Sequence, residues 1–573
     1  MSLRIGVVGC THGELDVIYR ALDDCVAQIG DGRPVDLLIC CGDFQACRNE
    51  GDLSCMSCPD KYLDMHEFFM YYNGAVEAPV PTLFIGGNHE AANHSAELPL
   101  GGWVAPRIWY MGSSGVVNFG GLRIGGISGI YKAYSFWLGY HERPPYSEDD
   151  QKSICHQRAF DFWRMAHCCP SGGAGGVSGE TPAAGGLVAA GAGSGSDAEK
   201  SSSSSSSGAT PMDVFLTHDW PAGVTEYGDK DGLLRQKPFF AEDVARGQLG
   251  SPPAMQLLHS LRPRFWFSGH LHVKFSALVP HFAPAAPSPA AAPSTAAAAA
   301  PHAPPTQPHS FTRFLALDKP EGRKPFLQVL DIPLSAEATA SPLAKAFHYD
   351  TQWCATLAAT HAATPLTSHR TSSSSGGSGG GGWGGASSRG LPPPLPPSRE
   401  ALAATAAALA RSSATACGAQ AAVADAAAAF ARAHPFRPVP IPANFHPCAP
   451  PHTGGKGFSG TRVPVFQQGN PQMDAFLAAL GLPHATTVPF SGGEGGGSGR
   501  GSGSGSGSGG GGRMGGGAGG PPLGHTDAIA GALPPQPLPL PGQQSEEAPP
   551  AAAVAAAGAA LGASADPAEI DIS

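Results

Sequence analysis

Leu3-Arg4-Ile5-Gly6-Val7-Val8-Gly9-Cys10-Thr11-His12-Gly13 is the stretch that decides the fold. Its first six residues are mostly apolar, as in a buried β-strand, and polar side chains between glycines follow, as in the loop that leaves such a strand. Apolar side chains then recur at helical spacing within residues 14–28, at Leu15, Ile18, Tyr19, Leu22 and Val26. A strand, a loop and a helix in this order predict a layered α/β fold, in which functional side chains gather beyond the carboxyl ends of the strands.

The same alternation of short apolar runs and helical patterns continues along the chain. A helix is predicted at about 60–73. Short strands are predicted at 36–40, 82–85, 108–110, 115–119, 122–127, 212–217, 264–268, 312–317 and 325–332. We therefore expect a β-sandwich flanked by helices.

Glycine and proline divide the chain into ordered and disordered parts. The 573 residues include 78 Gly and 56 Pro, roughly twice the combined share of an ordinary globular chain. Most of this excess lies outside the segments that we predict to form one domain, which are 1–169, 212–281 and 310–365. The intervening and following sequences have too few bulky apolar residues to order themselves, and we predict disordered insertions at 170–211 and 282–309 and a largely disordered tail at 366–573. Exceptions within the tail are a helix near 400–433 and an amphipathic stretch at 470–482.

Net charge and cysteine content restrict the partners and the compartment. The formal net charge is −10, so a polyanionic substrate must be bound by local groups or by metal ions. The 13 cysteines and the absence of a signal peptide favour free thiols in a reducing compartment. Cys55-Met56-Ser57-Cys58 has half the pattern of a zinc site, but no second pair lies at finger spacing, so we predict free thiols there too. No run reaches the roughly 18 apolar residues of a membrane span, and we expect no membrane association.

Five short clusters of metal-binding residue types follow predicted strands. They are Gly9-Cys10-Thr11-His12-Gly13, Cys41-Gly42-Asp43, Gly86-Gly87-Asn88-His89-Glu90, Thr217-His218-Asp219 and Ser268-Gly269-His270-Leu271-His272. Any one of them is ordinary in a loop, but five in order at strand ends indicate a site for two divalent cations. Such a site needs a bridging carboxylate, for which Asp43 is the natural candidate, together with neutral imidazoles and positions open for water and a phosphate oxygen. His270 and His272 lie on one tight turn, from which each reaches a different metal.

The ordered set resembles the calcineurin-like metallophosphoesterases, whose first motif is D-x-H where this chain has Cys10-Thr11-His12. In having cysteine at the aspartate position, the chain resembles the RNA lariat debranching enzymes. The resemblance covers about 1–169, 211–281 and 310–362, with a weaker match at Asn470-Pro471-Gln472. It extends over Cys40-Cys41-Gly42-Asp43-Phe44-Gln45-Ala46, Gly86-Gly87-Asn88-His89-Glu90, Gly125-Gly126-Ile127-Ser128-Gly129-Ile130-Tyr131-Lys132 and Phe215-Leu216-Thr217-His218-Asp219-Trp220-Pro221.

The resemblance implies a metallophosphoesterase-type sandwich and a role for each residue of the set. One metal would be held by Cys10, His12, Asp43 and His272, and the other by Asp43, Asn88, His218 and His270. His89 would be the catalytic general acid that protonates the departing 2′-oxygen. A thiolate ligand favours Fe²⁺ or Zn²⁺ over Mg²⁺, and Mn²⁺ is expected to work in vitro.

Residues 128–158, which we call the aromatic loop, resemble the lariat recognition loop of that family. Aromatic faces stack on unpaired bases and basic side chains neutralise phosphates, which would let an acidic protein hold branched RNA. Alternatively, these aromatic side chains pack on the sheet and cover the core. The candidate substrate-binding residues are Tyr131, Lys132, Tyr134, Phe136, Trp137, Tyr140, Arg143 and Arg158.

The function implied by the resemblance is hydrolysis, in the nucleus, of the 2′,5′-phosphodiester bond at the branch of excised intron lariat RNA during mRNA splicing and processing. One alternative is another phosphatase or phosphodiesterase of the superfamily, against which Cys10 and the aromatic loop argue. A second alternative is a non-catalytic scaffold of the same fold, which would lack some of the ligands. The tail is a candidate interaction segment for protein partners that the sequence does not identify.

Overall fold

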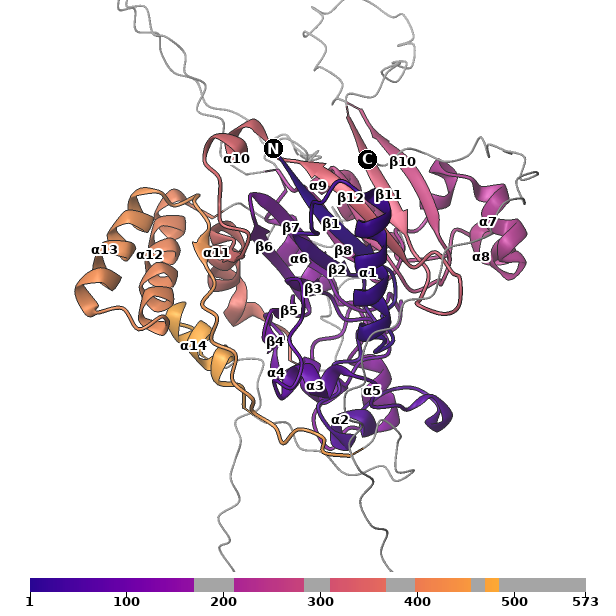
Figure 1. The fold of residues 1–573 in the computed structure, drawn as a ribbon, viewed down its shortest axis with the longest axis horizontal. Coiled ribbons are helices and arrows are strands. Elements are labelled where there is room, and N and C mark those ends of the chain that lie inside the picture. The colour runs from indigo at the N-terminus through magenta and orange to yellow at the C-terminus, as the bar shows by residue number, and fades with distance from the viewer. Residues whose placement is uncertain (170–210, 283–309, 367–396, 455–468, 484–573) are drawn as a thin grey trace, which may run out of the picture. The chain divides into compact units, whose positions relative to one another are not determined.

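The computed structural model describes residues 1–169, 211–282, 310–366, 397–454 and 469–483. These residues form two mixed β-sheets with helices around them (Figure 1). The predicted insertions, apart from Pro211 and Phe282, and the tail beyond 483 lie outside the described residues.

The first sheet has six strands in the order β12-β1-β2-β3-β5-β4. β1, β2, β3 and β5 are parallel, so the loops that follow these strands leave from one edge of the sheet. β12 and β4 are antiparallel to their neighbours and form the two outer strands. The strands are β1 (Ser2–Val8), β2 (Leu37–Cys40), β3 (Thr82–Phe84), β4 (Gly102–Ala105), β5 (Ile108–Tyr110) and β12 (Leu327–Pro333).

The second sheet has eight strands in the order β10-β11-β9-β8-β7-β6-β13-β14. Its central strands β11, β9, β8 and β7 are parallel, and the remaining pairs are antiparallel. The strands are β6 (Ser114–Phe119), β7 (Leu122–Ile127), β8 (Val214–Thr217), β9 (Phe265–Ser268), β10 (Phe275–His281), β11 (Ser310–Ala316), β13 (Phe347–Tyr349) and β14 (Val439–Pro440).

Alternate side chains of β1 show how the layers pack. Leu3 and Ile5 share a buried cluster with Leu216 of β8, which places this cluster between the two sheets. Val8 belongs instead to a cluster with Ile18 of helix α1 (Leu15–Ile29). The predicted α/β sandwich flanked by helices is therefore confirmed.

Short helices fill the connections between the strands. The predicted helix at 60–73 is interrupted: a 3-10 turn spans Asp60–Tyr62 and helix α3 spans Phe68–Tyr72. Between them the His66 N–H donates to the Asp64 carboxylate at 2.9 Å, a local bond that competes with helix formation. The other helices of the core are α2 (Glu50–Ser54), α4 (Ala92–Glu97), α5 (Glu148–Ser153), α6 (Ala159–Ala166), α7 (Lys230–Gln236), α8 (Ala241–Ala245), α9 (Pro252–Leu261), α10 (Ala336–Ala340) and α11 (Thr351–Thr360).

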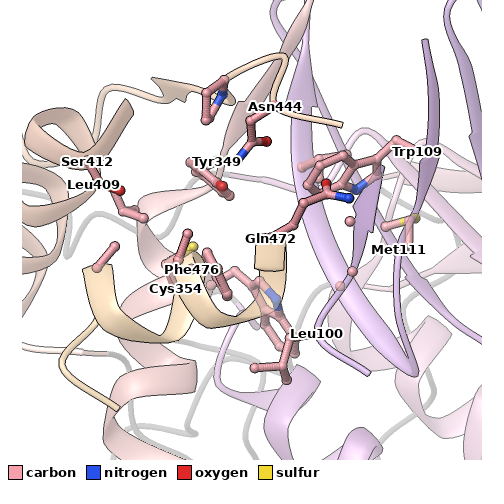
Figure 2. A pocket seen from close by; sticks show the side chains of 18 of the residues that line it. Leu100, Trp109, Met111, Tyr349, Cys354, Leu409, Ser412, Asn444, Gln472 and Phe476 are labelled. Atoms are coloured by element: carbon pink, nitrogen blue, oxygen red, sulfur yellow. The ribbon is translucent and has the colours of Figure 1, made fainter. Parts of the chain in front are cut away.

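Part of the range predicted as a tail is folded. Helices α12 (Arg399–Ala416), α13 (Ala421–Ala433) and α14 (Pro471–Ala479) follow α11. Leu409 of α12, Phe476 of α14 and Trp109 of β5 line one pocket (Figure 2). The helix expected near 400–433 and the amphipathic stretch expected at 470–482 are therefore both helical, and the folded residues 397–454 and 469–483 extend beyond them in a range predicted to be largely disordered. Small side chains such as Ala406 and Ala407 are buried here.

Helix α14 satisfies both backbone groups of Trp103 in the outer strand β4. The Gln472 Nε2 donates to the Trp103 carbonyl at 2.9 Å, and the Gln472 Oε1 accepts from the Trp103 N–H at 3.1 Å. One side chain thus provides both bonds that a further strand would provide. Asn470 caps the helix by accepting from the Gln472 N–H at 3.0 Å, and Pro471 fits the first helical position.

No helix in the described part of the chain is both long and apolar enough to cross a lipid bilayer. None of the 13 cysteines, all of which lie in the described residues, forms a disulfide. Whether Cys55 and Cys58 bind zinc stays a prediction from the sequence.

Candidate metal centre

The loops that follow five parallel strands converge at one place. Cys10 and His12 follow β1, Asp43 follows β2, and Asn88 and His89 follow β3, all in the first sheet. His218 follows β8, and His270 and His272 follow β9, in the second sheet. The predicted ligands thus come from both sheets and meet at their carboxyl ends.

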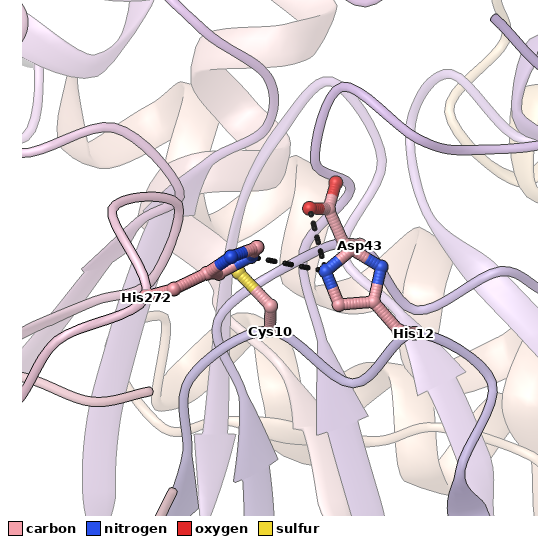
Figure 3. Close-up of side chains that lie close together, drawn as sticks. All are labelled: Cys10, His12, Asp43 and His272. Carbon is pink, nitrogen blue, oxygen red and sulfur yellow. Dashed lines mark hydrogen bonds and ion pairs between the residues drawn. The ribbon is translucent and has the colours of Figure 1, made fainter. Parts of the chain in front are cut away.

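Cys10, His12, Asp43 and His272 form a first group of donors (Figure 3). One ligand atom from each of them lies within 4.8 Å of the others. The Nε2 atoms of His12 and His272 are 3.0 Å apart, and the His12 Nε2 is 3.6 Å from the Asp43 Oδ2. Sulfur, nitrogen and oxygen donors at this spacing suit a divalent transition metal.

Asp43, Asn88, His218 and His270 form a second group. The His218 Nε2 lies 3.3 Å from the Asp43 Oδ1 and 3.2 Å from the Asn88 Oδ1, and the His218 and His270 ring centroids are 5.0 Å apart. Since the Asp43 Oδ2 faces His12 and its Oδ1 faces His218, this carboxylate lies between the two groups. That is the position of a bridging ligand.

The donor set of the second group fits a cation. The Cys41 carbonyl can only accept, so the His218 Nδ1, 2.7 Å away, carries a proton, and in the neutral ring the Nε2 presents a lone pair. This lone pair faces two oxygens that are themselves acceptors. Burial acts to lower the pKa of His218, but the Asp43 carboxylate, the Cys41 carbonyl and the Asp219 charge together outweigh it and raise the pKa. The same negative surroundings that favour a proton here favour a metal ion.

The imidazoles of His12, His270 and His272 are neutral. Burial lowers the pKa of His12 to about 4 and the pKa values of His270 and His272 to about 3. Neutral rings have a nitrogen lone pair available for a metal. Burial also raises the pKa of the Cys10 thiol, and the backbone N–H of His270, 3.0 Å from the sulfur, acts in the opposite direction by favouring the thiolate. Metal binding would release the thiol proton.

The backbone at the candidate ligands is strained. His12, Asp43, His270 and His272 have φ values of 47°, 46°, 67° and 48°, in the left-handed region that residues other than glycine rarely adopt. Each such residue costs on the order of 1–3 kcal/mol unless the surrounding structure holds it in place. Strain of this kind clusters at functional sites, and it lies here on four of the seven candidate ligands.

Glycine is required where the loops touch. A Cβ on Gly87 would lie 2.1 Å from the Asp43 Oδ1, and a Cβ on Gly42, whose φ is 105°, would lie 2.3 Å from the His218 Nδ1. Any side chain at either position would displace a candidate ligand.

Glu90 joins two of the loops, a role that sequence reasoning missed. Its carboxylate accepts the backbone N–H groups of Phe44, Gln45 and Gly87 at 2.7, 2.8 and 2.9 Å. Burial, together with the Asp43 charge, raises the pKa of Glu90 to about 7. The only signal in the sequence was an acid directly after Asn88-His89.

Asp219 joins the metal centre to the aromatic loop. Its carboxylate accepts the backbone N–H groups of Tyr131 and Trp220, each at 3.0 Å. Asp219 therefore holds the start of the aromatic loop. Burial raises the pKa of Asp219 to about 6.

His89, the predicted general acid, lies beside the first group. Its backbone N–H donates to the Asp43 Oδ1 at 2.9 Å, and its ring centroid is 5.9 Å from that of His12. The His89 Nδ1 is buried and has no hydrogen-bond partner among the described residues. The imidazole is therefore placed next to the donors without being held by them.

The candidate substrate-binding residues divide into exposed and buried sets. Tyr134 is 64% exposed and Lys132 is exposed, whereas Tyr131, Trp137 and Arg143 are partly exposed. Phe136 is buried among other aromatic rings and the Tyr140 hydroxyl donates to Asp161. Arg158 is buried in an ion pair with Glu142. Phe136, Tyr140 and Arg158 thus differ from the expectation, because their contacts hold the loop together.

Comparison with known proteins agrees with this geometry. Residues 3–189 match the family model of calcineurin-like phosphoesterases, and residues 309–485 match that of the lariat debranching enzyme, C-terminal domain. The lariat debranching enzyme of Arabidopsis thaliana is 38% identical over 370 residues, which cover 65% of this chain and 71% of the relative. The chain belongs to the lariat debranching enzyme family. The family's C-terminal domain match runs through α11, α12, α13 and α14, in agreement with the folded segments found beyond residue 366.

Animal members of the lariat debranching enzyme family show similar identity. The Drosophila pseudoobscura pseudoobscura enzyme is 43% identical over 371 residues, covering 63% of this chain and 60% of the relative. The Homo sapiens enzyme is 42% identical over 358 residues, covering 62% of this chain and 54% of the relative. The chain therefore spans between about half and 60% of the length of these animal relatives.

Proposed function

We propose that the protein hydrolyses the 2′,5′-phosphodiester bond at the branch of excised intron lariat RNA. The observation that carries this proposal is the Asp43 carboxylate between two groups of donors, with Cys10 in one of them. Linearising the lariat would allow intron RNA to be degraded after splicing, and we place this activity in the nucleus, where introns are excised. Family membership supports the same assignment.

Two divalent ions, when bound, would polarise the phosphate and activate a water molecule for attack on phosphorus. The residues that would hold them are Cys10, His12, Asp43 and His272 for one, and Asp43, Asn88, His218 and His270 for the other. The Cys10 sulfur favours Fe²⁺ or Zn²⁺ at the first site, and Mn²⁺ is compatible with the nitrogen and oxygen donors.

His89 is the proposed general acid. Its backbone is fixed by the hydrogen bond to Asp43, whereas its ring forms no hydrogen bond to a candidate ligand within the described residues and can face a substrate. Donation of a proton to the departing 2′-oxygen would leave a 2′-hydroxyl on the branch nucleotide and a 5′-phosphate on the released strand.

The aromatic loop is the proposed contact for the branch. Tyr134 and Lys132 provide an exposed ring and an exposed ammonium group, which suit an unpaired base and a phosphate. The Asp219 carboxylate accepts the backbone N–H of Tyr131, at the start of this loop, at 3.0 Å. Because Asp219 directly follows the candidate ligand His218, it connects the loop to the metal centre.

The decisive experiment compares two linkages in one assay. Purified protein with Fe²⁺, Zn²⁺ or Mn²⁺ should cleave the 2′,5′ bond of a synthetic branched RNA and leave the 3′,5′ bonds intact. Equal cleavage of both linkages would point to a less selective phosphodiesterase of the superfamily, and no cleavage with any of the metals would point to a scaffold. Cys10→Asp should shift the metal preference towards harder ions such as Mg²⁺; an unchanged preference contradicts the proposed role of the sulfur.

A further inference from the structure

The loop between β11 and β12, residues 318–325, begins beside two of the metal-binding loops. Ala316 lies opposite Ser268, the last residue of β9, and the Leu317 N–H donates to the Ser268 carbonyl at 3.3 Å. On the other side, a Cβ on Gly9 would lie 2.3 Å from the Leu317 carbonyl oxygen. The start of this loop is therefore packed between the strand ends that carry the candidate ligands of the first group.

The exposed part of this loop is basic. Lys319 and Lys324 both contact the Glu321 carboxylate, with Nζ to Oε2 distances of 3.1 and 2.6 Å, and Arg323 is exposed next to them. Glu321 is 59% exposed, and ion pairs at such a surface contribute little to stability. Two lysine side chains thus converge on one exposed carboxylate, where a phosphate oxygen would meet the same cations. Asp318 is a second acid nearby, 4.0 Å from the Lys324 Nζ.

The two basic segments start beside different groups of donors. Lys319 comes two residues after Leu317, whose backbone packs against Gly9 and Ser268 beside the first group. Lys132 follows Tyr131, whose backbone N–H is held by Asp219, the neighbour of His218 in the second group. Lys319 and Lys132 therefore belong to opposite sides of the metal centre.

We propose that residues 318–325 bind the phosphate backbone of one strand of the RNA substrate, with Lys319 as the main positioning residue. The inference rests on the proposed function. In a branched RNA, three strands are joined to one nucleotide. A protein that contacts RNA on only one side of the metal centre therefore leaves at least one of these strands without a contact. The aromatic loop faces the second group, and the basic loop can hold a strand that leaves past the first group. Phosphate contacts fix the position of a strand without reading its sequence.

The test measures RNA binding by the full-length, Mn²⁺-loaded protein. The probe is a fluorescent branched RNA whose 2′ linkage is a non-hydrolysable triazole, and anisotropy is recorded between low and moderate KCl concentrations. The variants are Lys319→Ala, Lys319→Arg and Glu321→Gln. The matched control is Lys345→Ala, which removes an exposed lysine paired with Asp36 at 2.5 Å, at the start of β2 and so at the opposite end of that strand from Asp43.

Lys319→Ala should weaken binding about five- to tenfold and reduce the slope of log affinity against log salt by about 0.7, the value for one phosphate contact on a single strand. Lys319→Arg should retain wild-type affinity, Glu321→Gln should bind more tightly, and Lys345→Ala should match the wild type. Equal affinity and equal salt slope for Lys319→Ala and Lys345→Ala would overturn the inference. It would also be overturned if Lys319→Arg, which keeps the positive charge, bound RNA as weakly as Lys319→Ala.

Cleavage of natural branched RNA by the wild type is measured separately, so that the two proposals fail in different ways. A wild-type protein that binds the probe but leaves the 2′,5′ bond intact contradicts the proposed reaction, while the affinities of the variants still decide the role of the loop. A wild-type protein that does not bind the probe overturns both.

Discussion

The metal centre and the aromatic loop adjoin each other but are built in different ways. The metal centre takes its side chains from five short loops, each of which follows a parallel strand. Several of its residues have positive φ values that the surrounding structure must maintain. The aromatic loop is one continuous segment of about 30 residues that folds on itself around Phe136 and the Arg158–Glu142 pair. In the first region the sheets decide where a side chain points, and in the second the contacts that each side chain makes, within the segment and with helix α6, decide it.

This difference explains which expectations hold. A residue directly after a parallel strand has little freedom, so residue type and position in the sequence placed all seven candidate ligands near one another. A residue within the aromatic loop can turn either way, and a residue type that suits RNA also suits a buried core. Lys132 and Arg158 are both basic, yet only the first is exposed.

The largest expected effect is at the carboxylate between the donor groups. Asp43→Asn keeps the size of the side chain but removes the negative charge that both groups share, and the protein should lose bound metal and all measurable cleavage of branched RNA. Metal content by mass spectrometry and single-turnover kinetics check this. Asp331→Asn, at the half-exposed surface end of β12, is the control and should keep both. Two metal equivalents retained by Asp43→Asn would show that this carboxylate is not a bridge.

A smaller effect is expected at His89. Replacing it by alanine keeps the backbone N–H that donates to Asp43, so metal content should stay near normal while the chemical step slows by about 100-fold. Rapid-quench measurement of one turnover, alongside metal analysis of the same sample, separates the two effects. Loss of metal from this variant would make His89 a ligand instead of an acid.

Within the aromatic loop, the largest effect concerns stability. Arg158→Ala leaves the Glu142 carboxylate buried without its partner, and the free energy of unfolding should fall by about 3–5 kcal/mol. Denaturant unfolding measures this, with Lys152→Ala at the exposed surface of the same loop as a near-neutral control. The double variant Arg158→Met, Glu142→Gln should recover part of the loss, because no unpaired charge remains. Unchanged stability together with weaker RNA binding would instead indicate that Arg158 binds the substrate.

The smallest effect is expected at the exposed ring. Tyr134→Ala removes a stacking surface that is worth on the order of 1–3 kcal/mol for one base, so KM for branched RNA should rise by about tenfold with unchanged thermal stability. Phe239→Ala removes an equally exposed ring, 71% exposed, outside the loop and should leave KM unaltered. If the two variants behave alike, exposed aromatic side chains of the aromatic loop have no special part in binding.

The sequence predicted the parallel strands of both sheets because each is a short apolar run with a polar loop behind it, whereas the outer strands β4, β10, β13 and β14 were not predicted. It did not predict the positive φ values at His12 and Asp43, since these arise from contacts between loops that are distant in sequence. Glu90 was overlooked for a related reason: its three bonds go to backbone groups, which leave no mark on residue type. The sequence predicts a helix where α12 and α13 lie, but its alanine residues do not indicate what that helix packs against.

The Gln472 amide on the outer strand β4 has a consequence for solubility. An outer strand whose backbone groups are open can pair with the same strand of another molecule, which is a route to aggregation. Gln472 occupies both backbone groups of Trp103 from a helix that lies more than 360 residues further along the chain. A chain that ends before α14 would retain the candidate metal ligands but expose the backbone groups of Trp103 at the edge of the sheet. We expect such a fragment to aggregate.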